Sequence, residues 1–218
     1  MQNNLEVFGN KLEKVEENKC EKVAENLLNL LASASQRGYV GEQVSQLEHA
    51  LQAAHCAQSK GYDEEVVIAA LFHDVGHLLT ELDGKKLPVM IDGESDSGSG
   101  WGVVDHEIVS AQYLKSLGFS RKVCELIRSH VSAKRYLTGK FPEYYESLSL
   151  PSKKTLQFQG GPLNQEEIFE YEKDEFFKMK VAMREFDDFA KKIDFRCPGL
   201  DFYKNIIVDH LKAQSLLF

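Results

Sequence analysis

Residues 69–77 read Ala69-Ala70-Leu71-Phe72-His73-Asp74-Val75-Gly76-His77, and this stretch decides the fold. Apolar residues lead into an adjacent His-Asp pair, and a second His follows four positions after the first. Residues four apart share one face of a helix, so the spacing predicts a helix on which His73 and His77 point the same way. The small residues in the stretch would let other helices approach closely. A buried His hydrogen-bonded to an Asp is also common in ordinary protein cores, so the pair alone does not establish a metal site.

Other histidines and one aspartate lie in further segments whose apolar pattern is helical. His49 and His106 each lie in such a segment, and His130 lies on the apolar stripe of another. Asp187 directly follows Phe186 on a fourth stripe. Polar groups that cannot reach water need partners, and an ionised carboxylate beside a core-facing stripe needs a strong one.

A metal centre would supply that partner to all of these residues together. Four histidines and two aspartates suit two ions that share a carboxylate, and nitrogen and oxygen ligands without thiolate favour iron or manganese over a structural zinc site. We therefore predict two metals, with Asp74 bridging them. The predicted ligands are His49, His73, Asp74, His106, His130 and Asp187. In the alternative interpretation each of these residues is satisfied independently, which is reasonable for one residue and strained for six.

Several sequence blocks extend the pattern beyond the ligands. They are Tyr39-Val40-Gly41-Glu42, Gln46-Leu47-Glu48-His49, Phe72-His73-Asp74-Val75-Gly76-His77, Ser129-His130-Val131-Ser132-Ala133-Lys134-Arg135-Tyr136, Gln159-Gly160-Gly161-Pro162 and Phe186-Asp187. The chain resembles the HD-domain superfamily in these blocks, from about Tyr39 to Leu211. Within that superfamily it is similar to the mixed-valent diiron oxygenases that cleave carbon-phosphorus bonds, whose type member is 2-amino-1-hydroxyethylphosphonate dioxygenase.

The resemblance implies a fold, two cofactor ions and a reaction. The fold would be an all-α HD-domain helical bundle with two iron ions (Fe2+/Fe3+) in its core. The reaction would use dioxygen to cleave a 1-hydroxy-organophosphonate into a carboxylate (glycine or a betaine) and phosphate. The residues implied to act near the reacting atoms are His77, Tyr39 and Glu42. The residues implied to bind the substrate are Lys134, Arg184, Ser152, Thr155 and Gln159.

Two other function classes remain open at this point. HD proteins mostly hydrolyse phosphate esters with a metal-generated hydroxide, so the alternative is a two-metal phosphohydrolase acting on a small phosphate ester or nucleotide. The third is a metal-binding or interaction protein without catalysis.

For the oxygenase, Glu42 would meet the far end of the substrate. We place the 2-amino compound slightly ahead of the trimethylammonio compound, because a quaternary ammonium needs aromatic faces around it.

Composition restricts the partners. A chain of 218 residues, 43% of them hydrophobic, suits one globular domain. Its net charge of −8 argues against a non-specific nucleic-acid binder. No run is long and apolar enough to span a membrane, and the four cysteines show no paired spacing. We expect a cytoplasmic monomer or homodimer that acts on a small organophosphonate and dioxygen, without nucleic-acid or membrane partners.

The remaining segments predict helices and one long loop. We expect an N-terminal helical extension over residues 1–37 and a single HD domain over residues 38–218. Residues 81–104 contain two Asp-Gly turns and a Gly-Ser run, so they are expected to form a long loop. This loop is either a disordered surface insertion or, as we favour, a lid that carries Trp101 over the site. Residues 152–162 are expected to form a polar loop. The expected helix N-caps are Asp63, Asp105, Ser120 and Asn164.

Overall fold

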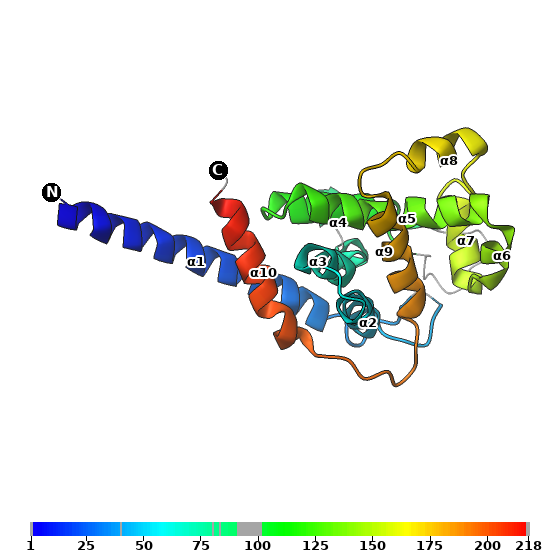
Figure 1. Ribbon diagram of the computed structural model, residues 1–218. Helices are drawn as coiled ribbons and strands as arrows, with labels where there is room; N and C mark the ends of the chain where they lie inside the picture. Colours follow the sequence, from blue (N-terminus) through cyan, green and yellow to red (C-terminus); the bar gives the residue numbers. More distant parts are fainter. Residues whose placement is uncertain (1, 40, 80, 83, 91–101, 217–218) are drawn as a thin grey trace.

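The computed structural model describes residues 2–39, 41–79, 81–82, 84–90 and 102–216 (Figure 1). Almost all of the regular structure in these ranges is helical, which confirms the all-α fold class. The elements are α1 (Gln2–Ala32), α2 (Gln46–Ser59), α3 (Glu64–Phe72), the 3-10 helix η1 (Val75–Leu78), α4 (His106–Ser116), α5 (Arg121–Lys140), α6 (Pro142–Ser147), α7 (Leu150–Phe158), α8 (Gln165–Tyr171), α9 (Phe177–Phe189) and α10 (Leu200–Ser215). Two short strands, β1 (Glu81–Leu82) and β2 (Lys85–Lys86), pair antiparallel.

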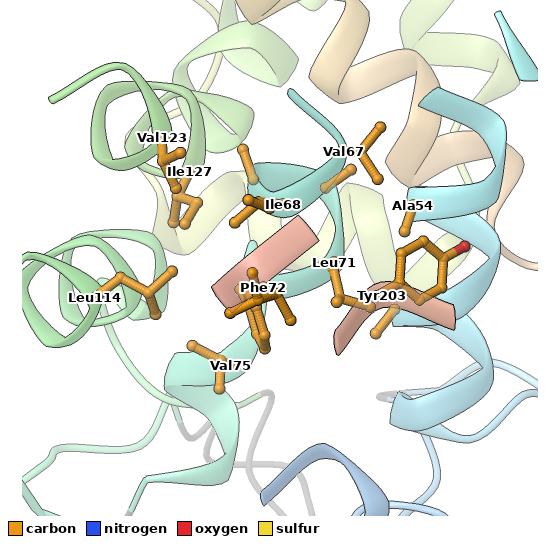
Figure 2. Packing of buried hydrophobic residues seen from close by; sticks show 14 of the residues in the cluster. Ala54, Val67, Ile68, Leu71, Phe72, Val75, Leu114, Val123, Ile127 and Tyr203 are labelled. Carbon is orange, nitrogen blue, oxygen red and sulfur yellow. The ribbon is translucent and has the colours of Figure 1, made fainter. Parts of the chain in front are cut away.

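Helix α3 lies at the centre of the bundle, and every residue from Val66 to Phe72 is buried. Its N-cap is Asp63, whose carboxylate accepts the backbone N–H of Val66 at 3.2 Å, as the sequence predicted. Figure 2 shows α3 side chains surrounded by residues from four other helices. These are Ala54 of α2, Leu114 of α4, Val123 and Ile127 of α5, and Tyr203 of α10. Each large side chain buried here contributes about 1.5–3 kcal/mol, so these neighbours together fix the position of the His-Asp pair at the end of α3.

The helix predicted to carry both His73 and His77 is interrupted between them. α3 ends at Phe72, His73 is its C-cap, and His77 lies in the 3-10 helix η1. Gly76 gives the physical reason. Its N–H donates to Ser110 Oγ at 2.8 Å, and a Cβ there would lie 2.3 Å from the carbonyl oxygen of His106. This close backbone approach presses η1 against α4 and brings the His-Asp pair next to His106.

Helix α5 is longer than the sequence predicted. It begins after Ser120, whose hydroxyl accepts the N–H of Val123 at 3.3 Å, and it continues past His130 through Lys134. Asp105 occupies the N-cap position of α4, as predicted, but its φ is 53° and its side chain makes no capping hydrogen bond. α5 packs along both α4 and α9, so it brings His130 between elements that carry other predicted ligands.

The C-terminal half differs from the prediction in two places. The loop expected over residues 152–162 is mostly helical, because α7 begins after the N-cap Ser149, with Pro151 in its first turn. Asn164 caps α8 in a full capping box, as predicted. Arg184 lies on α9, which ends at Phe189 instead of near residue 193.

Helix α1 covers Gln2–Ala32 of the predicted N-terminal extension without a break. Its buried residues Ala24, Leu27 and Leu31 belong to the main core, and the helix packs against α10. The division of the chain near residue 37 stays a prediction.

In the segment 81–104, an isolated bridge between Val89 and Val103 joins the two described ends. Trp101 and the lid interpretation lie outside the described residues.

Across the described ranges, no helix is both long and apolar enough to cross a membrane.

Candidate metal centre

The six predicted ligands converge from different parts of the fold. α2 supplies His49, the end of α3 supplies His73 and Asp74, and α4, α5 and α9 supply one residue each. They form two groups, and within each group the ligand atoms all lie within 4.8 Å of one another. The groups are His49, His73 and Asp187, and Asp74, His106 and His130. Asp187 is 3% exposed, so its carboxylate depends on buried partners.

Asp74 lies between the two groups. Its Oδ2 is 3.3 Å from His73 Nε2 and 3.5 Å from His49 Nε2. Its Oδ1 is 3.3 Å from His130 Nε2 and 3.4 Å from His106 Nε2. Each oxygen of one carboxylate therefore faces a different pair of histidines, which is the arrangement that a bridging ligand needs.

The protonation of the histidines directs their lone pairs toward this point. In three of them Nδ1 lies 2.8 Å from a backbone carbonyl oxygen, which can only accept a hydrogen bond. The pairs are His49 with Ala190, His73 with Ala70, and His130 with Ile127. Nδ1 therefore carries a proton in each ring, so in the neutral form the lone pair lies on Nε2, as in a metal-bound histidine oriented by its second nitrogen.

These lone pairs face one another at short range. His49 Nε2 is 3.1 Å from His73 Nε2, and His106 Nε2 is 3.0 Å from His130 Nε2. Two lone pairs at this distance repel unless a proton or a cation lies between them. Among the described residues, neither buried oxygen of Asp74 has a hydrogen-bond partner. Cations between the rings would satisfy the histidines and this carboxylate together, so the donor set indicates a metal cofactor.

With no cation present, the ionisation of the same groups follows from burial and from the neighbouring charges. Burial lowers the pKa of His49 to about 4. Burial also acts to lower the pKa of His73, but the adjacent Asp74 carboxylate outweighs it and raises that pKa to about 9. Asp187 is buried, yet Arg184 and then Lys191 hold its pKa well below the usual range. The cluster thus keeps buried carboxylates ionised, and such charges need strong cationic partners.

Removing the metal is expected to lower the melting temperature by about 10 °C. A ligand present at a thousand times its dissociation constant stabilises a fold by about 4 kcal/mol, and each kcal/mol shifts Tm by about 2–4 °C in a chain of this size. The measurement is a thermal scan of metal-loaded protein with and without a chelator, followed by re-addition of metal. An unchanged Tm in protein shown by elemental analysis to be metal-free would contradict the site.

A small cavity of about 50 Å³ opens beside the two groups. All eight residues predicted to act on or bind the substrate line it, although they lie far apart in the sequence. They are Tyr39, Glu42, His77, Lys134, Ser152, Thr155, Gln159 and Arg184. Lys191 and Met90 also line the cavity and were not predicted. Lys191 lies four residues after Asp187, a spacing that could have placed it near the site.

Tyr39 covers the side of the cavity next to the first group. Its ring stacks on His49 with centroids 3.8 Å apart and planes at 13°. Its hydroxyl lies 3.4 Å from Asp187 Oδ1. Burial, followed by the charge of Asp187, raises the pKa of Tyr39 well above the usual value, so the hydroxyl stays protonated.

His77 lies against the second group as a neutral ring. It stacks on His106 with centroids 3.9 Å apart, and its Nδ1 accepts the backbone N–H of Val103 at 3.1 Å. Burial and the neighbouring His106 lower the pKa of His77 well below the usual value. Its remaining proton is therefore on Nε2, which is a donor. Gly102 permits this contact, because a Cβ there would lie 2.5 Å from the ring.

Two buried cations line the cavity. Lys134 is 3% exposed and donates to Thr155 Oγ1 at 3.0 Å. Burial, followed by the charge of Arg184, lowers the pKa of Lys134 to about 7. Arg184 Nη1 donates to Asp187 Oδ2 at 2.7 Å, so this arginine joins the substrate cavity to the first ligand group.

Two residues that the sequence did not indicate hold Arg184 in place. Its Nε donates to Tyr144 Oη at 2.8 Å and to Asp188 Oδ2 at 3.1 Å, and its Nη2 donates to Asp188 Oδ1. Contacts with the described residues engage three of the five N–H groups of Arg184, and one on each terminal nitrogen has no partner among them and could bind an anion in the cavity. Asp188 adjoins a predicted ligand in the sequence, but only the tertiary structure brings Tyr144 to the same guanidinium.

The fold and this buried donor set are those of an HD-domain protein, and the chain belongs to that family. The family model described as HD domain matches residues 46–157. The matched segment contains five of the six predicted ligands, including the His-Asp pair. Arg184 and Asp187 lie beyond it, on α9.

Comparison with individual proteins narrows the resemblance. The chain is 36% identical to a [1-hydroxy-2-(trimethylamino)ethyl]phosphonate dioxygenase (glycine-betaine-forming) of Leisingera caerulea, over 73% of this chain and 76% of that protein. It is 35% identical to a hydroxymethylphosphonate dioxygenase of Gimesia maris, over 88% and 87%. It is also 32% identical to an uncharacterized protein of Acanthamoeba polyphaga mimivirus, over 96% and 89%. The predicted resemblance to HD-domain phosphonate dioxygenases is confirmed.

Proposed function

We propose that this chain is an iron-dependent oxygenase that cleaves the carbon-phosphorus bond of a 1-hydroxy-organophosphonate with dioxygen. One atom of dioxygen enters each product, the carboxylate and the phosphate, and one proton is released. The observation that carries the proposal is the placement of Lys134 and Arg184 in one small cavity beside both ligand groups. The names of two relatives, both phosphonate dioxygenases, support it.

The metal ligands proposed are the six residues of the two groups. Two iron ions held there would supply the redox chemistry that dioxygen activation requires and the Lewis acidity that polarises substrate oxygens. The nitrogen and oxygen donor set fits iron, and neither group contains a cysteine.

The residues lining the cavity would position the substrate. The protonated Lys134 and the two spare N–H groups of Arg184 face the phosphonate, the arginine through its planar donor geometry and the lysine as a point charge. Thr155 already accepts from Lys134, and Gln159 has a buried Oε1 without a partner among the described residues. The side-chain N–H groups of Gln159 and the hydroxyl of Ser152 can donate to the remaining phosphonate oxygens, and Gln159 Oε1 can accept from water around them.

The three residues proposed to act near the reacting carbon have distinct roles. Tyr39 blocks the open side of the first ligand group and would give way to the substrate oxygens. His77 would donate its Nε2 proton to a substrate oxygen near the second group. Glu42 would close the far end of the cavity.

A cytoplasmic location and a monomeric or homodimeric state remain predictions.

The test is oxygen consumption measured together with phosphate release from a 1-hydroxyphosphonate, using iron-loaded protein. We expect one phosphate for each dioxygen consumed, and no phosphate release under anaerobic conditions. The alternative, a two-metal phosphohydrolase, would release phosphate from an ester or nucleotide without oxygen. Phosphate release that does not depend on oxygen would therefore contradict the proposal in favour of the hydrolase.

The pH dependence of phosphonate binding follows from Lys134. Its pKa of about 7 means that the free protein carries this charge below pH 7 and loses it as the pH rises. A bound dianion stabilises the charged form and raises the pKa, so affinity is expected to fall by up to about tenfold for each pH unit above 7. Calorimetric titration from pH 6.5 to about 9 under anaerobic conditions measures this. The Lys134→Met variant should bind weakly at every pH, and a slope that persists in it would assign the titration to another group.

A further inference from the structure

Lys191 is a third cation at the cavity, and it lies beside the residue expected to meet the far end of the substrate. Its Nζ is 3.4 Å from Glu42 Oε1 and donates to Ser152 Oγ at 3.1 Å. Ser149 Oγ donates to the same Glu42 oxygen at 2.7 Å. The Lys191 and Glu42 side chains are only 15% and 17% exposed, so their pairing is partly shielded from solvent.

We propose that Lys191 occupies the place beside Glu42 that a positively charged substrate tail would otherwise take. The cavity then accepts a 1-hydroxyphosphonate with no cationic group, and hydroxymethylphosphonate is the simplest member of that class. This inference rests on the proposed function and concerns the same site. It departs from the substrates expected from the sequence, the 2-amino and trimethylammonio compounds, which both carry a cationic group that Glu42 was free to bind.

The charge of Lys191 reaches the rest of the cavity. It contributes to lowering the pKa of Lys134 and that of Asp187. An ammonium group brought to Glu42 would therefore lie next to a like charge in a shielded place, or would have to displace Lys191 from both of its partners. Like charges brought together at a recognition site disfavour the wrong ligand strongly.

The lining of the cavity supports the same substrate class. Quaternary ammonium groups are recognised by several aromatic faces. Among the described residues, Tyr39 is the one phenol, indole or phenyl ring on the cavity wall, and it already stacks on His49.

The test compares two probes, hydroxymethylphosphonate and 2-amino-1-hydroxyethylphosphonate, on the parent protein and on Lys191→Met. Binding is measured by anaerobic calorimetry, and turnover by phosphate release in air. We expect the parent to bind hydroxymethylphosphonate, the probe without a cationic group, at least about tenfold more tightly. In Lys191→Met, which keeps the apolar stem and frees Glu42, that preference should fall by about tenfold or reverse.

Two further variants make the outcome decisive. Lys192→Met is the matched control, because Lys192 is an exposed neighbour whose Nζ lies 3.7 Å from the ring of Phe189, and it should keep the parent preference. Adding Glu42→Gln to Lys191→Met should abolish the gain in amine binding, since the gain requires the freed carboxylate. Lys191→Gln serves the same purpose if the methionine variant folds poorly.

Two results would overturn the inference. One is a parent protein that prefers the amino probe. The other is an equal loss of affinity for both probes in Lys191→Met, which would make Lys191 a phosphonate contact instead. If neither probe yields phosphate in air, the proposed function fails, whereas the ratio of the two binding constants still tests the role of Lys191 separately.

Discussion

Asp74→Asn is expected to remove bound iron from both ligand groups and to lower kcat by about a thousandfold, because metal ions contribute several kcal/mol to such reactions and each 1.4 kcal/mol is tenfold in rate. The reason is the position of this carboxylate, with one oxygen facing His49 and His73 and the other facing His106 and His130. An amide is a weak ligand and cannot supply the negative charge that two cations share. Elemental analysis of purified, iron-reconstituted protein gives the number of ions per chain.

A comparison among carboxylates isolates the bridging role. Asp187→Asn should lose iron mainly from the first group, since Asp187 lies only in that group. Asp209→Asn removes the charge of an exposed residue on α10 and should keep both the metal content and the activity. If Asp74→Asn retains as much iron as the Asp209 control, Asp74 does not bridge the ions.

Lys134→Met is expected to raise KM for a 1-hydroxyphosphonate by about a hundredfold, because truncating one partner of a buried charge pair costs about 2–5 kcal/mol. Iron content should stay that of the parent, since Lys134 contacts Thr155 and neither ligand group directly. The measurement is KM by phosphate release, with elemental analysis of the same sample. Lys178→Met, at an exposed position on α9, is the control for loss of a lysine charge. An unchanged KM in Lys134→Met would remove this residue from the phosphonate site.

Arg184 would not give so clean a result. The resemblance found in the sequence implied only a substrate-binding role for Arg184, but Arg184 also donates to Asp187 and Asp188. Arg184→Ala would leave the buried Asp187 without its strongest cationic partner, a situation that destabilises proteins by about 3–5 kcal/mol. Arg184→Ala would therefore reduce substrate binding, metal content and stability together. For this reason Lys134→Met is the better test of the phosphonate site.

The sequence predicted which residues come together at the site better than it predicted the helices that carry them. Histidines and aspartates on apolar stripes are recognisable, because burying a polar side chain without a partner is costly. This pattern identified residues as far apart in the sequence as His49 and Asp187. The break after Phe72 could not be predicted, because it depends on the backbone of Gly76 approaching His106 across the fold. The polar composition of residues 152–162 suggested a loop, yet Ser149 and Pro151 start a helix that presents Ser152 and Thr155 to the cavity.

The sequence also did not indicate which residues contact the positively charged side chains of the cavity. Lys134 meets Thr155, Arg184 meets Tyr144, and Lys191 meets Glu42, and each contact joins different elements. A charged residue on a helix is by itself more often solvated than buried, so its function depends on tertiary contacts that no local pattern encodes.

The two ligand groups differ in how much chain must be synthesised before each is complete. Asp74, His106 and His130 span fewer than 60 residues, whereas the other group joins His49 and His73 to Asp187, beyond the segment that matches the family. Loop-closure entropy and synthesis from the N-terminus both favour the group that closes locally. The local group therefore needs less of the chain to be complete, whereas α9 supplies both the third ligand of the other group and Arg184.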